Sequence, residues 1–294
     1  MEQTLQQLIN GVSLGSIYAL IALGYTMVYG IINLINFAHG DIYMVGAYVG
    51  YALTTFLGLG FLPSLLISMM VCSLLGMAIE KVAYKPIRNS TRIAALITAI
   101  SVSLFLQYTM MYFVKPDTRT FPDVLKGKRL ALFGGNVMLD SKNIYILLIT
   151  IVLMVGLQYI VRKTKIGKAM RAVSLDKDAA ELMGVDVNKT ISYTFALGSA
   201  LAGAAGVLVG VYYNTINPLM GAGPGLKAFV AAVLGGIGII PGAVFGGFFL
   251  GMTETMVSAY GGSIFKDAVA FGILILVLLV KPNGLLGKTV KEKI

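Results

Sequence analysis

The chain has 294 residues, of which 57% are hydrophobic and 12% charged, whereas an ordinary soluble domain carries about 25% charged residues. Its 23 Lys and Arg against 13 Asp and Glu give a net charge of +10, and its single cysteine, Cys72, lies in an apolar stretch. This composition excludes a soluble globular enzyme, a disordered tail and a disulfide scaffold. Because the cations lie between apolar segments rather than in one patch, it also argues against nucleic-acid binding.

In chain order the apolar residues form nine blocks, and the longer ones match the roughly 20 residues that a helix needs to cross a bilayer. Helices are expected because an isolated strand cannot satisfy its backbone groups in lipid, and the alternating pattern of a membrane barrel is missing. The blocks are 8–35, 42–62, 64–79, 93–114, 144–161, 191–213, 227–240, 242–258 and 266–281. Pro241 beside Gly242 breaks the chain between two short blocks. The sequence therefore predicts an all-α polytopic membrane protein, one domain over 1–294, with eight or nine transmembrane helices.

The orientation follows from segments that are rich in Lys and Arg, which mark the cytoplasmic side of a membrane. These segments are 80–92, the loop 162–190 and the tail 281–294. The loop 115–143 is one block away from each basic neighbour and is expected outside, although it has six cations of its own. Within it, Gly134-Gly135-Asn136 between short apolar runs predicts a β-hairpin. Nine crossings, with the N-terminus outside and the C-terminus inside, fit these charges.

A short internal repeat suggests two related halves. Leu14-Gly15-Ser16 precedes Asn33-Leu34-Ile35-Asn36 by about one span, and Leu197-Gly198-Ser199 precedes Asn214-Thr215-Ile216-Asn217 at nearly the same distance. In the topology above the first copy runs inward and the second outward. Such inverted repeats are typical of transporters, with the pathway at the interface between the repeats.

Polar residues interrupt the apolar blocks at positions that could line such a pathway, since ionisable groups inside a membrane are costly. The candidate pathway residues are Asn36, Phe37, His39, Gly40, Asp41, Asn214, Asn217 and Glu254. Each has a plainer alternative. The first segment could be a cytoplasmic turn with Asp41 as the N-cap of the next helix, Asn214 and Asn217 could belong to a surface turn, and Glu254 could pair with a cation of a neighbouring helix.

Motifs for enzymatic chemistry are missing. One histidine and one cysteine exclude a zinc site built from several of either. Gly287-Lys288-Thr289 lacks the glycine of a phosphate-binding loop, because Pro282 stands in its place. Gly221-Ala222-Gly223-Pro224-Gly225 has neither the preceding strand nor the downstream acid of a dinucleotide site. We therefore expect no catalytic residue, no metal site and no cofactor bound by this chain.

The loop 162–190 contains the most specific local signal. Residues 176–184 predict a short helix that is capped by Asp176 and ends at Gly184. Leu175, Ala179, Leu182 and Met183 recur at helical spacing and form one apolar stripe. A lipid surface could cover this stripe, but the flanking acids would be repelled by anionic lipid. A groove on a soluble partner is the favoured interpretation.

With these features in place, the chain resembles the permease subunits, of the H-subunit type, of ATP-binding-cassette (ABC) importers for branched-chain amino acids. The resemblance covers essentially the whole chain. Its motifs are residues 15–20 (GSIYAL), 35–40 (INFAHG), 178–180 (DAA), 182–184 (LMG), 194–198 (TFALG), 202–206 (AGAAG), 234–236 (LGG) and 281–285 (KPNGL). Glu181 stands where many relatives carry a basic residue.

The resemblance implies a transport subunit of the bacterial or archaeal cytoplasmic (inner) membrane that translocates leucine, isoleucine or valine. It implies as partners a second homologous permease, two ABC ATPase subunits that bind ATP and Mg²⁺, and a periplasmic or lipid-anchored amino-acid-binding protein. The coupling helix that docks on an ATPase subunit would comprise Asp176, Asp178, Ala179, Ala180, Leu182, Met183 and Gly184. The alternatives are an importer of the same architecture for urea or short amides, an ion-coupled secondary transporter with Asp41, His39 and Glu254 as its relay, and a structural or receptor-like membrane protein.

Overall fold

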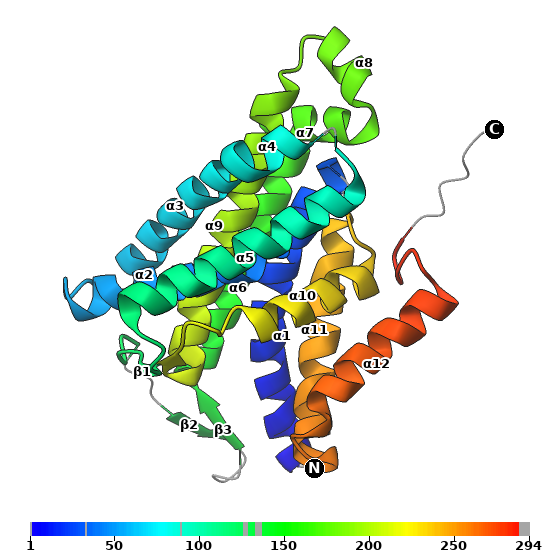
Figure 1. The fold of residues 1–294 in the computed structure, drawn as a ribbon. Helices are drawn as coiled ribbons and strands as arrows, with labels where there is room; N and C mark the ends of the chain where they lie inside the picture. Colours follow the sequence, from blue (N-terminus) through cyan, green and yellow to red (C-terminus); the bar gives the residue numbers. More distant parts are fainter. Residues whose placement is uncertain (1, 33, 89, 126–128, 133–136, 288–294) are drawn as a thin grey trace.

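The computed structural model describes residues 2–32, 34–88, 90–125, 129–132 and 137–287, and these are mostly helical (Figure 1). Among them, six helical segments are long and apolar enough to cross a membrane. These are α1 (Glu2–Ile32), α3 (Phe61–Ile79) continued through the π-helical turn η1 (Glu80–Tyr84) into α4 (Lys85–Ile87), α5 (Arg92–Val114), α6 (Ser141–Lys163), α9 (Val187–Tyr213), and α11 (Ile240–Met256) with η3 (Val257–Gly261). The protein is therefore a multi-pass membrane protein.

Three further apolar helices are shorter. They are α2 (His39–Thr55), α10 (Ala222–Gly235) and α12 (Phe265–Val280), of 17, 14 and 16 residues. At about 1.5 Å per residue each falls short of the roughly 30 Å hydrocarbon core. Each of the nine predicted blocks overlaps a helix, but the break between the seventh and eighth blocks lies at 236–239 rather than at Pro241. Gly236 and Gly238 make it with positive φ, and Pro241 lies in the first turn of α11, where a missing N–H costs nothing.

The strands are short and lie at one end of the bundle. β2 (Arg129–Leu132) pairs antiparallel with β3 (Val137–Asp140), with Arg129 opposite Asp140 and Leu132 opposite Val137. The turn predicted at Gly134-Gly135-Asn136 lies outside the described residues. β1 (Arg119–Thr120) pairs antiparallel with β4 (Thr215–Ile216). This second pair joins the loop after α5 to the loop after α9, and no pattern in the sequence indicated it.

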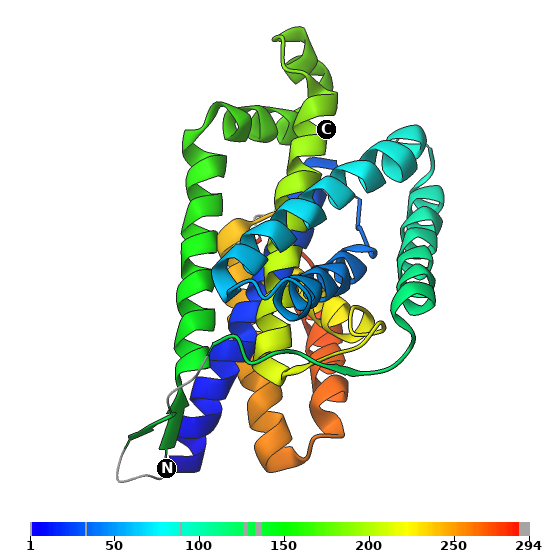
Figure 2. The same ribbon diagram turned by 90° about the vertical axis from the view of Figure 1, so that its left-hand side faces the viewer.

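The centre of the molecule is formed by α1 and α9, which run in opposite directions (Figures 1 and 2). In each helix, 89% of the most apolar 18-residue stretch is buried inside the protein. This is expected for helices that are apolar on all sides. Small residues let the two backbones approach: a Cβ added to Gly198 would lie 3.2 Å from the Gly24 carbonyl oxygen. These two helices form the core on which the others pack.

Both central helices are followed by a break and a short helix. Residues 34–38 lead from the break after α1 into α2, and residues 214–221 lead from α9 into α10. Each short helix packs against the long helix of the other pair, α2 against α9 and α10 against α1. The two short helices meet near their N-termini, where Gly40 lies against Gly221 and Gly225.

The contact between α2 and α9 depends on glycine. A Cβ on Gly46 would lie 2.5 Å from the Gly203 Cα, so we expect Gly46→Ala to destabilise the protein by about 1–3 kcal/mol through overpacking. Gly156 in α6 is the matched control, since a Cβ there meets nothing within 4 Å, and Gly156→Ala is expected to be neutral or stabilising by up to about 1 kcal/mol. Thermal unfolding of the purified variants in detergent measures both, and equal melting temperatures for the two would contradict the prediction.

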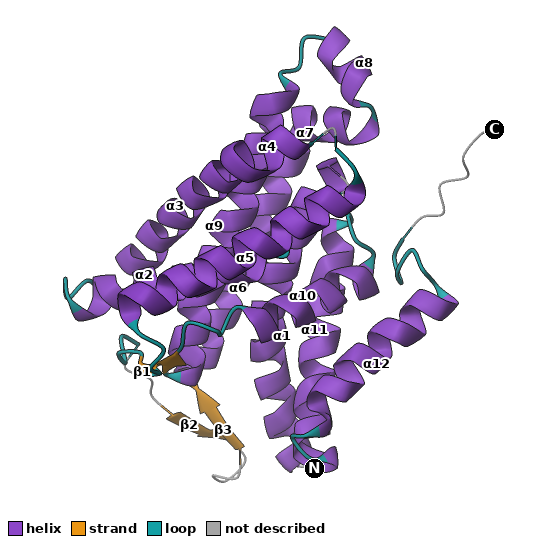
Figure 3. Cartoon of the chain, viewed as in Figure 1, coloured by secondary structure: helices purple, strands orange, loops and turns teal. Residues whose placement is uncertain are grey.

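The ends of the bundle differ in charge and structure. The N-terminus and β1–β3 lie at one end, and α4, α7 (Lys165–Leu175) and α8 (Lys177–Leu182) lie at the other (Figures 1 and 3). The basic segments 80–92 and 162–190 thus share an end that is opposite to the loop 115–143. This is the arrangement that the charge pattern predicts.

Candidate functional site

A short helix projects from the end of the bundle, on the loop between α6 and α9 (Figure 1). This helix, α8, begins at Lys177 because Asp176 caps it: the Asp176 Oδ1 accepts hydrogen bonds of 3.0 Å from the backbone N–H groups of Asp178 and Ala179. The preceding helix, α7, begins in the same way, with the Thr164 Oγ1 accepting from the N–H of Gly167 at 3.1 Å. Local capping alone therefore accounts for the predicted start of α8.

The end of α8 is equally well defined. Gly184 has a φ of +81°, a conformation that glycine adopts without strain. The Gly184 N–H donates to the Glu181 carbonyl at 2.9 Å, and the Val185 N–H donates to the Ala180 carbonyl at 3.0 Å. These two bonds form a Schellman motif, which satisfies carbonyls that the helix end would leave free. The predicted glycine stop is confirmed.

The apolar stripe of this loop has nothing to pack against within the described chain. Leu175, Leu182 and Met183 are 89%, 88% and 84% exposed, and Ala179 is exposed beside them. Only Ala180 turns inward and is buried. Large apolar side chains gathered on an exposed helix mark a surface that another component covers.

The ion pair between Glu80 and Arg88 holds the start of α9, which follows α8, against η1 and α4. The Glu80 carboxylate accepts from Arg88 at 2.6 Å and from the Ser192 hydroxyl at 2.6 Å, and Arg88 also donates to Asn188 at 2.8 Å. The start of α9 is thereby joined to η1 and α4. At the same helix start, the bond from the Lys189 backbone N–H holds the pKa of Asp186 below its ordinary value. Sequence reasoning missed Glu80, although it is the one acid in the basic segment 80–92.

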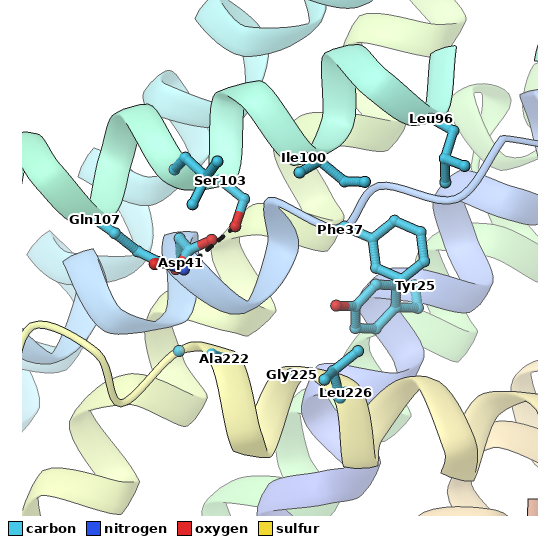
Figure 4. Close-up of a pocket in the computed structure, with 12 residues that line it drawn as sticks. Tyr25, Phe37, Asp41, Leu96, Ile100, Ser103, Gln107, Ala222, Gly225 and Leu226 are labelled. Carbon is cyan, nitrogen blue, oxygen red and sulfur yellow. Dashed lines mark hydrogen bonds between the residues drawn. The ribbon is translucent and has the colours of Figure 1, made fainter. Parts of the chain in front are cut away.

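A cavity of about 350 Å³ lies where the two helix breaks meet (Figure 4). Phe37 and Asp41 come from the first break and the start of α2, and Gly221, Ala222 and Gly225 come from the second break and the start of α10. α5 closes the opposite wall. Cavities of this size hold small molecules, so the molecule has a ligand-sized space at the junction of its two broken helices.

The cavity is apolar except along one side. Leu96 and Ile100 of α5 lie across from Tyr25, Phe37 and Leu226 (Figure 4), and Leu104 of α5 also lines the cavity. The polar side is formed by Asp41, Ser103 and Gln107: the Gln107 Nε2 donates to the Asp41 Oδ1 at 2.9 Å and to the Ser103 Oγ at 3.3 Å. One carboxylate therefore stands beside largely apolar walls.

The other predicted residues of the first break are buried nearby. Asn36 accepts from the Tyr84 hydroxyl at 2.8 Å, and His39 stacks edge-on against Tyr25 with ring centroids 4.8 Å apart. His39 opens α2, and the helix start has Ala38, without a side-chain cap, as its N-cap. The alternative in which Asp41 caps the helix is therefore wrong, because Asp41 lies inside the first turn and its side chain reaches α5.

The residues predicted at the second break lie outside the cavity lining. Asn214 ends α9 in the left-handed conformation and accepts from Lys142 at 3.2 Å. Asn217 accepts from the backbone N–H of Leu219 at 3.0 Å and closes a turn. The turn interpretation fits these contacts, and the wall residues that this segment supplies, Gly221 and Gly225, come from the glycine-rich stretch 221–225 that follows it.

Glu254 lies apart from the cavity and is buried with a cation. Its Oε1 is 2.7 Å from the Lys227 Nζ, and its Oε2 accepts from the Tyr18 hydroxyl at 2.8 Å. Lys227 also lies 2.6 Å from Asp267 of α12. The alternative that Glu254 pairs with a cation of a neighbouring helix is confirmed. Sequence reasoning missed Lys227, whose signal was a lone cation at the start of the apolar block 227–240.

These features together define a class: a helical membrane transport protein with two broken central helices, a cavity at their junction, and a short helix with an exposed apolar face at one end. Comparison with known proteins specifies it further. Residues 7–278 match the family model described as branched-chain amino acid transport system / permease component. The chain is 44% identical to the high-affinity branched-chain amino acid transport system permease protein BraD of Pseudomonas aeruginosa, over 99% of this chain and 98% of that protein.

Other relatives agree. The permease LivH of Escherichia coli K12 is 44% identical over 99% of this chain and 97% of its own length. A probable LivH of Methanocaldococcus jannaschii is 30% identical over 92% and 89%. The structure of PsaBC from Streptococcus pneumoniae has a TM-score of 0.51 over 95% of this chain and 92% of that one, at 14% identity, which shows a shared fold alone. The chain belongs to the family of branched-chain amino acid transport system permease components.

Proposed function

We propose that this chain is the membrane-spanning permease subunit of an ABC importer that moves leucine, isoleucine and valine across the inner membrane. Its partners in this proposal are a second homologous permease, two ATPase subunits that bind ATP and Mg²⁺, and a binding protein that delivers the amino acid from outside. The observation that carries the proposal is the exposed apolar face of α8 in a chain of this family. A permease whose transport is driven by separate ATPase subunits must present a surface that binds them.

The topology in this proposal has nine crossings, with the N-terminus outside and the C-terminus inside. The six long segments supply six crossings, and α2, α10 and α12 supply the others. The opposite directions of α1 and α9, each with its break and short helix, support two inverted repeats (Figure 2). The loop 115–143 then faces the binding protein and the loop 162–190 faces the ATPase, within a single permease domain over 1–294.

The coupling role belongs to Asp176, Asp178, Ala179, Ala180, Leu182, Met183 and Gly184. Caps at both ends make α8 a rigid element despite its six residues. A displacement of α8 would move α9, which follows it in the chain. The contacts among Glu80, Arg88 and Asn188 would transmit this displacement to α3 and α4. Displacing these helices would change the space between the two broken helices, where Phe37, Gly40 and Asp41 lie.

Purification of the chain from its native membrane tests the proposal. We expect two nucleotide-binding chains and a second permease to accompany it, and the reconstituted complex with its binding protein to take up labelled leucine only with ATP. Excess valine or isoleucine should suppress this uptake and urea should not. Uptake by vesicles that contain this chain alone and follow an ion gradient would contradict the proposal. Suppression by urea would favour the amide importer instead.

A further inference from the structure

The described part of the chain buries three acidic side chains: Asp41, Glu80 and Glu254. Buried charges in proteins are normally paired, because an isolated ion loses its hydration without compensation. Glu80 is paired with Arg88, and Glu254 is paired with Lys227. Among the described residues, Asp41 takes part in no ion pair. Its side-chain hydrogen-bond partners are neutral groups of α5, the amide of Gln107 and the hydroxyl of Ser103.

The unpaired carboxylate is also the one that faces a cavity (Figure 4). One carboxylate among apolar walls offers too few oxygens to hold a calcium ion, which takes about six to eight, or a magnesium ion. It suits an organic cation whose remaining surface is apolar. The walls contributed by Leu96, Ile100 and Phe37 match an aliphatic side chain.

The start of α10 supplies a positive partner beside the Asp41 carboxylate, and a zwitterionic ligand needs both. α10 begins at Ala222 in the wall of the cavity, and Gly221 lies close to the Asp41 Oδ1. The N-terminus of a helix carries positive partial charge and favours an anionic group. The ammonium and carboxylate groups of an α-amino acid are bonded to the same carbon, so their negative and positive partners must lie side by side. The Asp41 carboxylate and the start of α10 are placed in this way.

We infer that this cavity is a transit subsite for aliphatic amino acids, in which Asp41 binds the ammonium group of the passing substrate and α5 packs on its side chain. The inference rests on the proposed function. It also explains why Asp41 has no protein cation: a permanent partner would occupy the place of the ammonium group.

Asp41→Asn in the complete transporter, reconstituted with its ATPases and binding protein, tests the subsite. Asparagine keeps the size of the side chain and an oxygen for Gln107, and it removes the charge. We expect leucine uptake to fall about tenfold or more, the effect of losing a charge-assisted hydrogen bond, while ATP hydrolysis stimulated by the loaded binding protein stays within twofold. Asp41→Glu should restore part of the uptake.

Asp140→Asn is the matched control, since Asp140 caps α6 outside the cavity and asparagine caps as well. Its uptake should remain at the wild-type level. Wild-type uptake by Asp41→Asn would overturn the subsite, and so would equal losses of uptake and ATP hydrolysis, which indicate a structural role. Failure of the wild-type complex to take up leucine would instead overturn the proposed function.

Photo-leucine, a leucine analogue with a diazirine in its side chain, provides a readout that does not depend on the variant folding. During turnover of the wild-type complex it should label peptides that contain Leu96–Leu104 or Leu226. An excess of leucine should remove the label, and Asp41→Asn should weaken it. Labelling confined to other segments would overturn the assignment.

Discussion

Leu182→Asp is expected to abolish ATP-driven uptake while leaving the permease folded and inserted. Leu182 is 88% exposed, so a carboxylate there touches no other part of the described chain. In the proposed complex the same carboxylate would take the place of an apolar side chain that the ATPase covers, and burying a charge there is costly. Loss of a hot-spot contact in an interface costs about 2 kcal/mol or more, about a thirtyfold loss of affinity.

The measurements are ATPase retention on the immobilised permease and leucine uptake in proteoliposomes. Leu182→Met keeps an apolar side chain and should retain both. Ser174→Asp adds the same charge at an exposed position of α7, outside the α8 stripe, and should retain most of the uptake.

Ala180→Asp and Gly184→Asp should also uncouple uptake from ATP hydrolysis, but for a different reason: Ala180 is buried and Gly184 has a positive φ. If Leu182→Asp binds the ATPase and transports normally, α8 is not the coupling helix.

The difference between Leu182 and Ala180 also marks what sequence could and could not predict. The start, the end and the apolar stripe of α8 depend on neighbours within a few residues: the Asp176 cap, the glycine stop at Gly184 and the helical period. All of these were visible in the printed sequence. Which alanine turns inward depends on how α8 packs against the helices around it, and that required the structure.

The cavity and the buried ion pairs, in contrast, could not be predicted from the sequence. Asp41 meets Gln107 across 66 positions of the chain, and Tyr18 meets Glu254 across 236. No local pattern encodes such pairs. The sequence marked Asp41 and Glu254 as costly groups in apolar surroundings, but it could not show that Glu254 is paired with Lys227 and that Asp41 has no cation.

Lys227→Met is expected to be the most destabilising substitution considered. Lys227 and Glu254 form a pair of 2.7 Å whose side chains are 9% and 6% exposed. Methionine has a similar shape but leaves the buried Glu254 carboxylate with the Tyr18 hydroxyl as its close donor, and its remaining cation, Lys266, is 42% exposed and lies 4.0 Å away. Breaking a buried pair by removing one partner costs about 3–5 kcal/mol, because the remaining charge is uncompensated. The loss should appear as a large fall in the melting temperature in detergent.

Two further variants separate the pair from its surroundings. Lys227→Met combined with Glu254→Gln removes both charges and should recover most of the stability, since replacing a whole buried pair is often nearly neutral. Asp267→Asn removes the second partner of Lys227, but Asp267 is 58% exposed, and solvent-screened pairs are worth about 0–1 kcal/mol. The expected order of melting temperatures is therefore wild type, Asp267→Asn, the double variant, then Lys227→Met. A double variant that melts below Lys227→Met would mean that Glu254 stabilises α1 through Tyr18 independently of its cation.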